Sequence, residues 1–205
     1  MTSTTTLVLA SRSATRIALL RSAGLTLTID PADVDEDSIG AAVADPAGRA
    51  MALAHKKAQV VSARHPGALV IGGDQVCTLA GADGPRFLEK PTDPEDHVLM
   101  LLAMAGRTHT FFPAAVLVKD GVVHAEIHES VRVVFRDFDE RTARAYVASG
   151  EGKGSCGGYE SEHRGAQLIA HIDGTQHAVL GLPLLGILAA LRTLAASGVV
   201  VDGLL

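Results

Sequence analysis

Aromatic side chains are scarce in this 205-residue chain: they make up 3% of the residues, and tryptophan is absent. Proteins that bind single-stranded nucleic acid stack the bases on aromatic side chains, so the composition argues against such a platform. The chain also has no basic excess, because its formal net charge is −5 and its lysines and arginines are dispersed. This argues against a surface for duplex DNA or an anionic membrane, whereas a small phosphorylated ligand needs only a few local cations.

Long apolar runs are missing as well, since none reaches the roughly 18 residues of a transmembrane helix. The longest run, 178–191, is interrupted by glycine and proline. The N-terminal MTSTTT has no basic region followed by an apolar segment, so we expect no signal peptide. The two cysteines, Cys77 and Cys156, lack metal-type spacing and favour a reducing, cytoplasmic setting. The length suits one domain or two small lobes.

The stretch from Leu7 to Leu20, LVLASRSATRIALL, predicts a short strand, a polar turn and a helix. Ser13 is placed to cap that helix, which puts Arg16 in its first turn. The free N–H groups and the dipole of a helix N-terminus favour anions. The stretch therefore indicates a phosphate site, and an ordinary strand-to-helix connection with a serine cap gives the same pattern.

An acidic loop follows at 30–37, where five of eight residues carry a carboxylate. Such a loop is typical of a solvated surface, or of a divalent-cation site, because hard cations bind oxygen ligands. The apolar spacing of 48–64 predicts a helix, and Lys57 falls within its apolar arc. A lysine in that place must reach the surface, form an ion pair or bind a ligand.

Asp74 ends a continuous apolar run, 68–73. The run predicts a buried strand whose C-terminal end delivers Asp74, and ligands of α/β folds collect at such ends. A turn aspartate after two glycines is the alternative. Pro91 keeps Lys90 out of helical geometry, so Lys90 is either a cation on a stiff loop or an ordinary solvent lysine.

The remaining pattern predicts three further helices, at 93–104, 139–146 and 183–196, and several strands. Strands at 108–119 and 122–135 flank Asp120-Gly121, a strong hairpin signal that disfavours a purely parallel sheet. The glycine-rich loop 150–158 fails the phosphate-binding-loop spacing, and either a mobile ligand loop or a flexible linker fits it. Histidine spacing of the zinc-protease type and a Gly-x-Ser-x-Gly elbow are absent.

Taken in order, these pieces resemble the Maf family of nucleoside triphosphate pyrophosphatases over nearly the whole chain. The opening LVLASRSATRIALL is similar to the family's L-A-S-x-S-P-R-R-x-E-L-L, and VIGGDQV is similar to its G-A-D-T-V. The other matching pieces are PADVDE, LAHKKA, EKP at 89–91, MAGRTH at 104–109 and LGLPL at 180–184. Each piece is weak alone, but their shared order makes the resemblance strong.

The resemblance implies a role for each matching polar residue. Those implied in triphosphate binding are Ser11, Arg16, Lys57 and Lys90. Asp74 is implied as the group that orients or deprotonates the attacking water. Glu36 and Asp74 together are implied as ligands of a divalent metal, Mg²⁺ or Mn²⁺.

Several positions depart from the family pattern. Ala14 and Thr15 replace a proline and an arginine, and Arg12 could compensate for the missing cation. Gln75 replaces the threonine after the aspartate. The segment SCGGYESEHRG is more similar to the C-A-G-S-F-K-S-E-G-L-G of the branch associated with 7-methyl-GTP than to the dTTP and UTP branch, and it places Glu162 in the base-recognition segment.

By resemblance we expect a single mixed α/β domain, 1–205, in which a long curved, largely antiparallel or mixed sheet lies between two lobes and the nucleotide lies between the lobes. The expected reaction is hydrolysis of a nucleoside triphosphate to monophosphate and pyrophosphate with a divalent metal. The family is often dimeric, so a homodimer is one expectation. Two alternatives stay open: a nucleotide-binding regulator of septum formation with little turnover, and a phosphatase that removes terminal phosphates.

Overall fold

The computed structural model describes residues 4–205, and the chain divides into two compact units. Residues 1–3, part of the segment predicted to hold no signal peptide, lie outside the described residues. The first unit consists of the chain up to Asp74, 113–129 and 181–205, and the second of 75–112 and 130–180. Two long strands, β3 and β5, contribute residues to both units.

Within residues 4–205, eight strands form one mixed sheet in the order β2-β1-β3-β5-β7-β8, with β4 paired to β3 and β6 to β5. The strands are β1 Leu7–Leu9, β2 Thr28–Ile29, β3 Leu69–Gly81, β4 Gly84–Phe87, β5 Thr108–Lys119, β6 Val122–His128, β7 Val131–Phe135 and β8 Ile169–Asp173. Strand β1 is parallel to β2 and β3, whereas β3–β4, β5–β6, β5–β7 and β7–β8 are antiparallel. The predicted mixed α/β class is confirmed.

The helices are α1 Ala14–Ser22, α2 Glu36–Ala41, α3 Pro46–Ser62, α4 Pro94–Met104, α5 Glu140–Ala148, α6 Gln176–Val179 and α7 Leu184–Ala196, with a 3₁₀ turn at Arg164–Leu168. All five predicted helices are present, and the side chains of Asp93 and Asp139 cap α4 and α5. Helices α2 and α6 escaped prediction because six and four residues are too few to show a helical period. No helix in the described part of the chain has the length and apolarity to cross a membrane.

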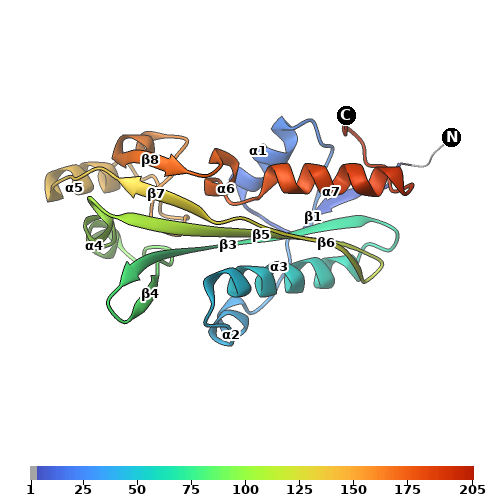
Figure 1. The fold of residues 1–205 in the computed structure, drawn as a ribbon, viewed down its shortest axis with the longest axis horizontal. Coiled ribbons are helices and arrows are strands. Elements are labelled where there is room, and N and C mark those ends of the chain that lie inside the picture. Colours follow the sequence, from blue (N-terminus) through green and yellow to red (C-terminus); the bar gives the residue numbers. More distant parts are fainter. Residues whose placement is uncertain (1–3) are drawn as a thin grey trace. The chain divides into compact units, whose positions relative to one another are not determined.

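In the first unit, α3 and α7 lie on opposite faces of the strands (Figure 1). Helix α3 approaches β3 at Gly72, where an added Cβ would stand 2.2 Å from the carbonyl oxygen of Ala54 and 2.6 Å from the backbone nitrogen of Ala58. Only glycine permits this contact between backbones. This close approach fixes the position of α3 along β3, and so determines which side chains of α3 face which residues of the strand.

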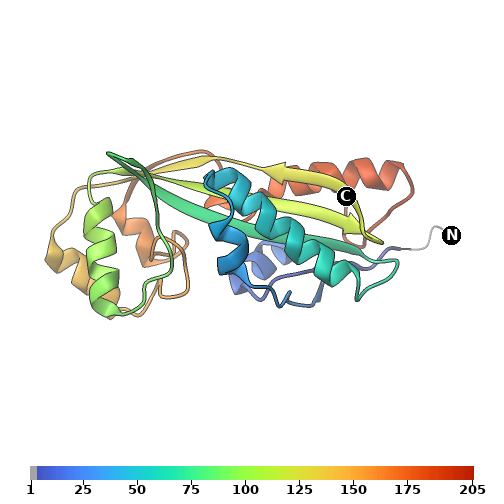
Figure 2. The same cartoon turned by 90° about the horizontal axis from the view of Figure 1, so that it is seen from below.

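The second unit has its own core, in which α4 and α5 lie side by side (Figure 2). His109 of β5 is fully buried there, and its ring meets the rings of Phe111, Phe135 and Tyr159 edge-on. Its Nε2 lies 2.8 Å from the Tyr159 hydroxyl. Burial lowers the pKa of His109 to about 3, so the imidazole is neutral in the folded protein.

Two strand predictions were wrong. Strand β3 does not end at Asp74 but continues to Gly81, so Asp74 lies in mid-strand. Buried residues on both sides of the glycine pair keep the chain extended, as in a central strand. The strand predicted over 122–135 is instead β6 and β7, because β6 pairs with 114–119 of β5 and β7 with 108–111, on either side of Pro113.

Candidate active site

The side chain of Lys57 lies between two carboxylates in the first unit. Its Nζ is 2.7 Å from Asp74 Oδ1 and 2.8 Å from Glu36 Oε1. Lys57 and Asp74 are 6% and 7% exposed, which makes this a buried ion pair. The sequence left three alternatives for a lysine in an apolar arc, namely reaching the surface, forming an ion pair or binding a ligand. The structure shows ion pairs.

Three elements bring these residues together. Lys57 lies in α3 between Ala54 and Ala58, the two residues that touch the backbone of β3 at Gly72. Asp74 is two residues further along β3, and in a strand residues i and i+2 share a face. Glu36 is the first residue of α2, whose N-cap Asp35 accepts a hydrogen bond from the backbone N–H of Ser38. Part of the acidic loop is therefore a helix start that delivers a carboxylate to Lys57.

Glu36 and Asp74 supply oxygen donors of the kind that Mg²⁺ and Mn²⁺ bind. The Lys57 ammonium shows that a positive charge is accommodated between them. Within residues 4–205, no group of three or more His, Cys, Asp or Glu side chains could hold a metal ion. Mg²⁺ is commonly held by one or two carboxylates together with substrate phosphates, so this pair fits a metal that binds together with a phosphorylated ligand.

The serine-rich elbow before α1 has the predicted cap, because Ser13 Oγ accepts a hydrogen bond from the backbone N–H of Arg16. Ser11 Oγ accepts one from the backbone N–H of Ser13 at 3.2 Å. Arg16 donates from its guanidinium to the carbonyl oxygen of Gly73 at 2.7 Å and to that of Gly181 at 3.0 Å. Arg16 therefore holds the backbone next to Asp74.

Arg12 is the exposed cation of this elbow. Across residues 4–205, its side chain makes no hydrogen bond or ion pair, in contrast to that of Arg16. A charged side chain beside the free N–H groups of a helix start is well placed to meet an anion. The structure thus shows an exposed Arg12 beside an Arg16 whose guanidinium is hydrogen-bonded to backbone carbonyl oxygens.

Lys90 and Glu162 belong to the second unit and are both exposed. The loop that carries Lys90 is joined to the glycine-rich loop, because the backbone N–H of Gly157 donates to the Glu89 carbonyl at 3.4 Å. The structure thus brings Glu36, Lys57 and Asp74 into contact, and it places Lys90 and Glu162 in the other unit.

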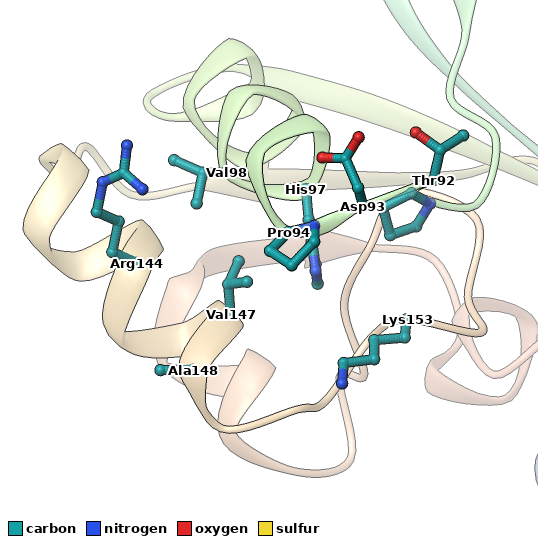
Figure 3. A pocket seen from close by; sticks show the side chains of 10 residues that line it. Thr92, Asp93, Pro94, His97, Val98, Arg144, Val147, Ala148 and Lys153 are labelled. Carbon is teal, nitrogen blue, oxygen red and sulfur yellow. The ribbon is translucent and has the colours of Figure 1, made fainter.

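A pocket of about 520 Å³ in the second unit contains none of the predicted site residues (Figure 3). It lies between α4 and α5, and Val98, Val147 and Lys153 are among the residues that line it. Arg144 also lines it, but two ion pairs with Glu95 and Glu140 occupy that guanidinium and raise its pKa. Pro91 is a lining residue too, so the pocket adjoins the loop of Lys90.

Three polar side chains of the second unit make contacts that sequence reasoning did not predict. Gln75 hydrogen-bonds to the end of α6, and Gln176 of α6 hydrogen-bonds to Ser161. Gln75 was visible in the sequence as a departure after Asp74. No sequence signal marks Gln176, because its partner is 15 residues away and α6 was not predicted.

The chain shares its fold with solved structures of HAM1 proteins. A HAM1 protein from Coxiella burnetii superposes with a TM-score of 0.52 over 90% of this chain and 98% of that protein, at 14% identity. The Staphylococcus aureus Ham1 protein gives a TM-score of 0.50 over 93% of this chain and 98% of that protein, at 15% identity. At such identities the likeness shows a shared fold.

Sequence comparison then gives the family. The model of the Maf-like protein family matches residues 6–194, and the chain belongs to that family. It is 41% identical over 196 residues to a 7-methyl-GTP pyrophosphatase of Mesorhizobium japonicum, which covers 93% of this chain and 96% of the relative. It is 39% identical over 191 residues to a nucleoside triphosphate pyrophosphatase of Rhodopseudomonas palustris. That match covers 91% of this chain and 93% of the relative.

Proposed function

We propose that this protein hydrolyses nucleoside triphosphates to monophosphate and pyrophosphate. The observation that carries the proposal is the buried Lys57 ammonium between Glu36 and Asp74. Arg16 in the first turn of α1 is hydrogen-bonded to Gly73, the residue before Asp74. The relatives named for nucleoside triphosphate and 7-methyl-GTP pyrophosphatase activity support the same reaction. The enzyme is accordingly a hydrolase of acid anhydrides.

In this reaction a water oxygen forms a new bond to the α phosphorus, and the bond between the α phosphorus and the oxygen that bridges to the β phosphate breaks. Pyrophosphate leaves with the electron pair of that bond. Asp74 orients the water and accepts its proton, as a general base does. Lys57, Arg12 and the free N–H groups of α1 counter the charge of the phosphates. Lys90 is proposed as a further phosphate contact. Arg16 keeps Gly73 and hence Asp74 in place.

Glu36 and Asp74 would hold the divalent metal when the nucleotide binds. That metal would neutralise phosphate charge and act as a Lewis acid on the phosphate oxygens. Glu36→Gln should then weaken Mn²⁺ binding about tenfold or more, measured by electron paramagnetic resonance of free Mn²⁺ in the presence of an α,β-methylene triphosphate. Glu140→Gln, an exposed carboxylate of α5, is the matched control. Unchanged Mn²⁺ affinity in Glu36→Gln would remove Glu36 from the site.

Pyrophosphate detection with a panel of common and modified triphosphates tests the reaction itself. Wild-type protein should release pyrophosphate with Mg²⁺ or Mn²⁺. Asp74→Asn should lower kcat by a factor of about 100 or more while nucleotide binding is retained. Asp83→Asn, in an exposed turn, should leave kcat unchanged. Release of orthophosphate would contradict the proposal, and binding without any release would favour a regulator.

We further propose that the segment around Glu162 contributes to base preference, with 7-methyl-GTP among the candidate substrates. The support is that Glu162 is exposed while the preceding Ser161 is buried and held by Gln176. Glu162→Gln should change the order of kcat/KM across common and methylated bases, whereas His163→Gln should not. An unchanged order in Glu162→Gln would dismiss Glu162 as a base contact.

Cellular setting and assembly complete the proposal. A cytoplasmic location suits an enzyme of the nucleotide pool, and both cysteines are free thiols, as a reducing compartment favours. A homodimer is the proposed assembly, and sedimentation at several protein concentrations tests it. A single monomeric species at all concentrations would rule the dimer out.

A further inference from the structure

Gln75 occupies a distinctive place in the chain, because it follows Asp74 directly and begins the second unit. Its side-chain amide donates to the carbonyl oxygens of Ala178 at 2.9 Å and Val179 at 3.0 Å. These carbonyls lie in the last turn of α6, where helix carbonyls lack partners four residues ahead. Both amide protons of Gln75 therefore hold the C-terminal end of α6.

The acceptor end of the same side chain meets the glycine-rich loop. Cys156 Sγ lies 3.6 Å from Gln75 Oε1 and 3.9 Å from the Gln75 backbone carbonyl oxygen. One residue thus contacts two segments that are far from it in sequence, namely α6 and the loop that leads into Ser161 and Glu162. A terminal amide can do this because it offers two donors and an acceptor at once.

Helix α6 carries the connection onward. Gln176, at its first position, donates from Nε2 to Ser161 Oγ at 2.9 Å. Ser161 is 8% exposed, and Glu162, the next residue, is exposed. All of these contacts lie within the second unit. A continuous set of hydrogen bonds therefore runs from the residue beside Asp74 to the residue beside Glu162.

We propose that Gln75 and Gln176 are positioning residues that set which base the protein accepts, by holding the Ser161–Glu162 segment through α6. This rests on the proposed function, since it concerns the nucleotide site of that enzyme. Neither glutamine contacts the base. Gln176 fixes the position of Ser161 through its hydrogen bond to the serine hydroxyl. Gln75 in turn holds α6, the helix that carries Gln176.

Binding of α,β-methylene analogues of the four common ribonucleoside triphosphates, measured by calorimetry, tests this without turnover. The analogues carry equal charge, so the ratio of their dissociation constants reports on the base. In Gln176→Leu, which keeps side-chain volume and loses the donor, that ratio should change about fivefold, the factor expected for one lost hydrogen bond. Gln167→Leu, in the nearby 3₁₀ turn and exposed, should leave the ratio unchanged.

Two conservative variants separate positioning from folding. Gln176→Glu should keep the wild-type ratio, because the Ser161 hydroxyl can donate to the new carboxylate. Gln75→Glu should not, because its partners, the Ala178 and Val179 carbonyl oxygens, can only accept. Thermal unfolding checks that every variant is folded.

Each outcome decides between this proposal and its rejection. A changed ratio in Gln176→Leu with restoration in Gln176→Glu supports the positioning role. An equal loss of affinity for all four analogues, or no base preference in the wild type, overturns it. Absence of pyrophosphate release from the wild type would instead refute the proposed function, since the binding ratio does not depend on catalysis.

Discussion

At the scale of single residues, the ion pair of Lys57 with Asp74 is a stability element as well as a site. Removing one member of a buried pair leaves an uncompensated charge, which costs several kcal/mol. We expect Lys57→Met to lower the free energy of unfolding by about 3 kcal/mol, measured by urea denaturation. Lys56→Met, exposed on the same helix, is the control.

The double variant Lys57→Met/Asp74→Asn sharpens this prediction. It removes both charges of the pair, so its loss of unfolding free energy should be smaller than the sum of the two single losses. If the losses of unfolding free energy in the two single variants simply add up in the double variant, Lys57 and Asp74 do not stabilise each other, although their charged atoms lie 2.7 Å apart.

The two cysteines should differ in reactivity. Cys77 is 1% exposed, and burial raises the pKa of its thiol well above the ordinary value. Cys156 is only half-buried. Because the thiolate is the reactive form, we expect one thiol to react quickly with a disulfide reagent at pH 8 and the second only after denaturation. Cys156→Ser should abolish the fast phase, and two equally fast thiols would contradict the assignment.

At the scale of elements, the contact of α3 with β3 at Gly72 decides where Lys57 meets Asp74. Gly72→Ala would press a methyl group into the backbone of α3. We expect it to lower the free energy of unfolding by about 1–3 kcal/mol and to lower kcat, because α3 and Lys57 must move. Gly154→Ala, where an added Cβ meets nothing within 4 Å, is the control. Equal stability of the two variants would refute this account.

The same elements show how far sequence reasoning reached. Helical spacing of the apolar residues located α3, and the same spacing showed that Lys57 is a charged residue on the apolar side of that helix. Asp74 was singled out as a candidate but placed at a strand end, since the local pattern of two glycines and an aspartate looks like a turn. The close packing of Gly72 against α3 and of Gly73 against Leu182 explains why β3 continues through both glycines without a turn.

Other contacts of the candidate site were out of reach of the sequence. The bonds from Arg16 to the Gly73 and Gly181 carbonyls join positions 57 and 165 residues apart, and backbone acceptors leave no trace in residue identity. Glu36 was predicted through resemblance, but the helix that presents it was not. Pattern therefore identified the charged residues, and tertiary structure decided their partners.

At the scale of the whole molecule, buried His109 links stability to pH. Its pKa is about 3 when folded and rises toward the ordinary 6.5 when the chain unfolds, so between these values the unfolded state binds the extra proton. The stabilisation is complete above pH 6.5 and is lost as the pH falls toward 3. At pH 5 the loss from this group is about 2 kcal/mol.

Urea denaturation at pH 7 and pH 5 measures this dependence. His109→Gln, which retains an amide for the Tyr159 hydroxyl, should make the difference between the two pH values smaller. His124→Gln, exposed on β6, should leave it as in the wild type. The same difference in all three proteins would mean that other groups set the acid sensitivity.

The division of the chain also has a consequence for synthesis on the ribosome. The first unit needs residues 181–205, whereas the second is complete once residue 180 has been made. Chains emerge N-terminus first, so the segment that carries Lys57 and Asp74 is translated early and yet must wait for 181–205 to complete its unit. We expect nascent chains that have emerged from the ribosome as far as residue 180, with 181–205 still inside its tunnel, to protect the second unit from protease while leaving the first unit open to cleavage.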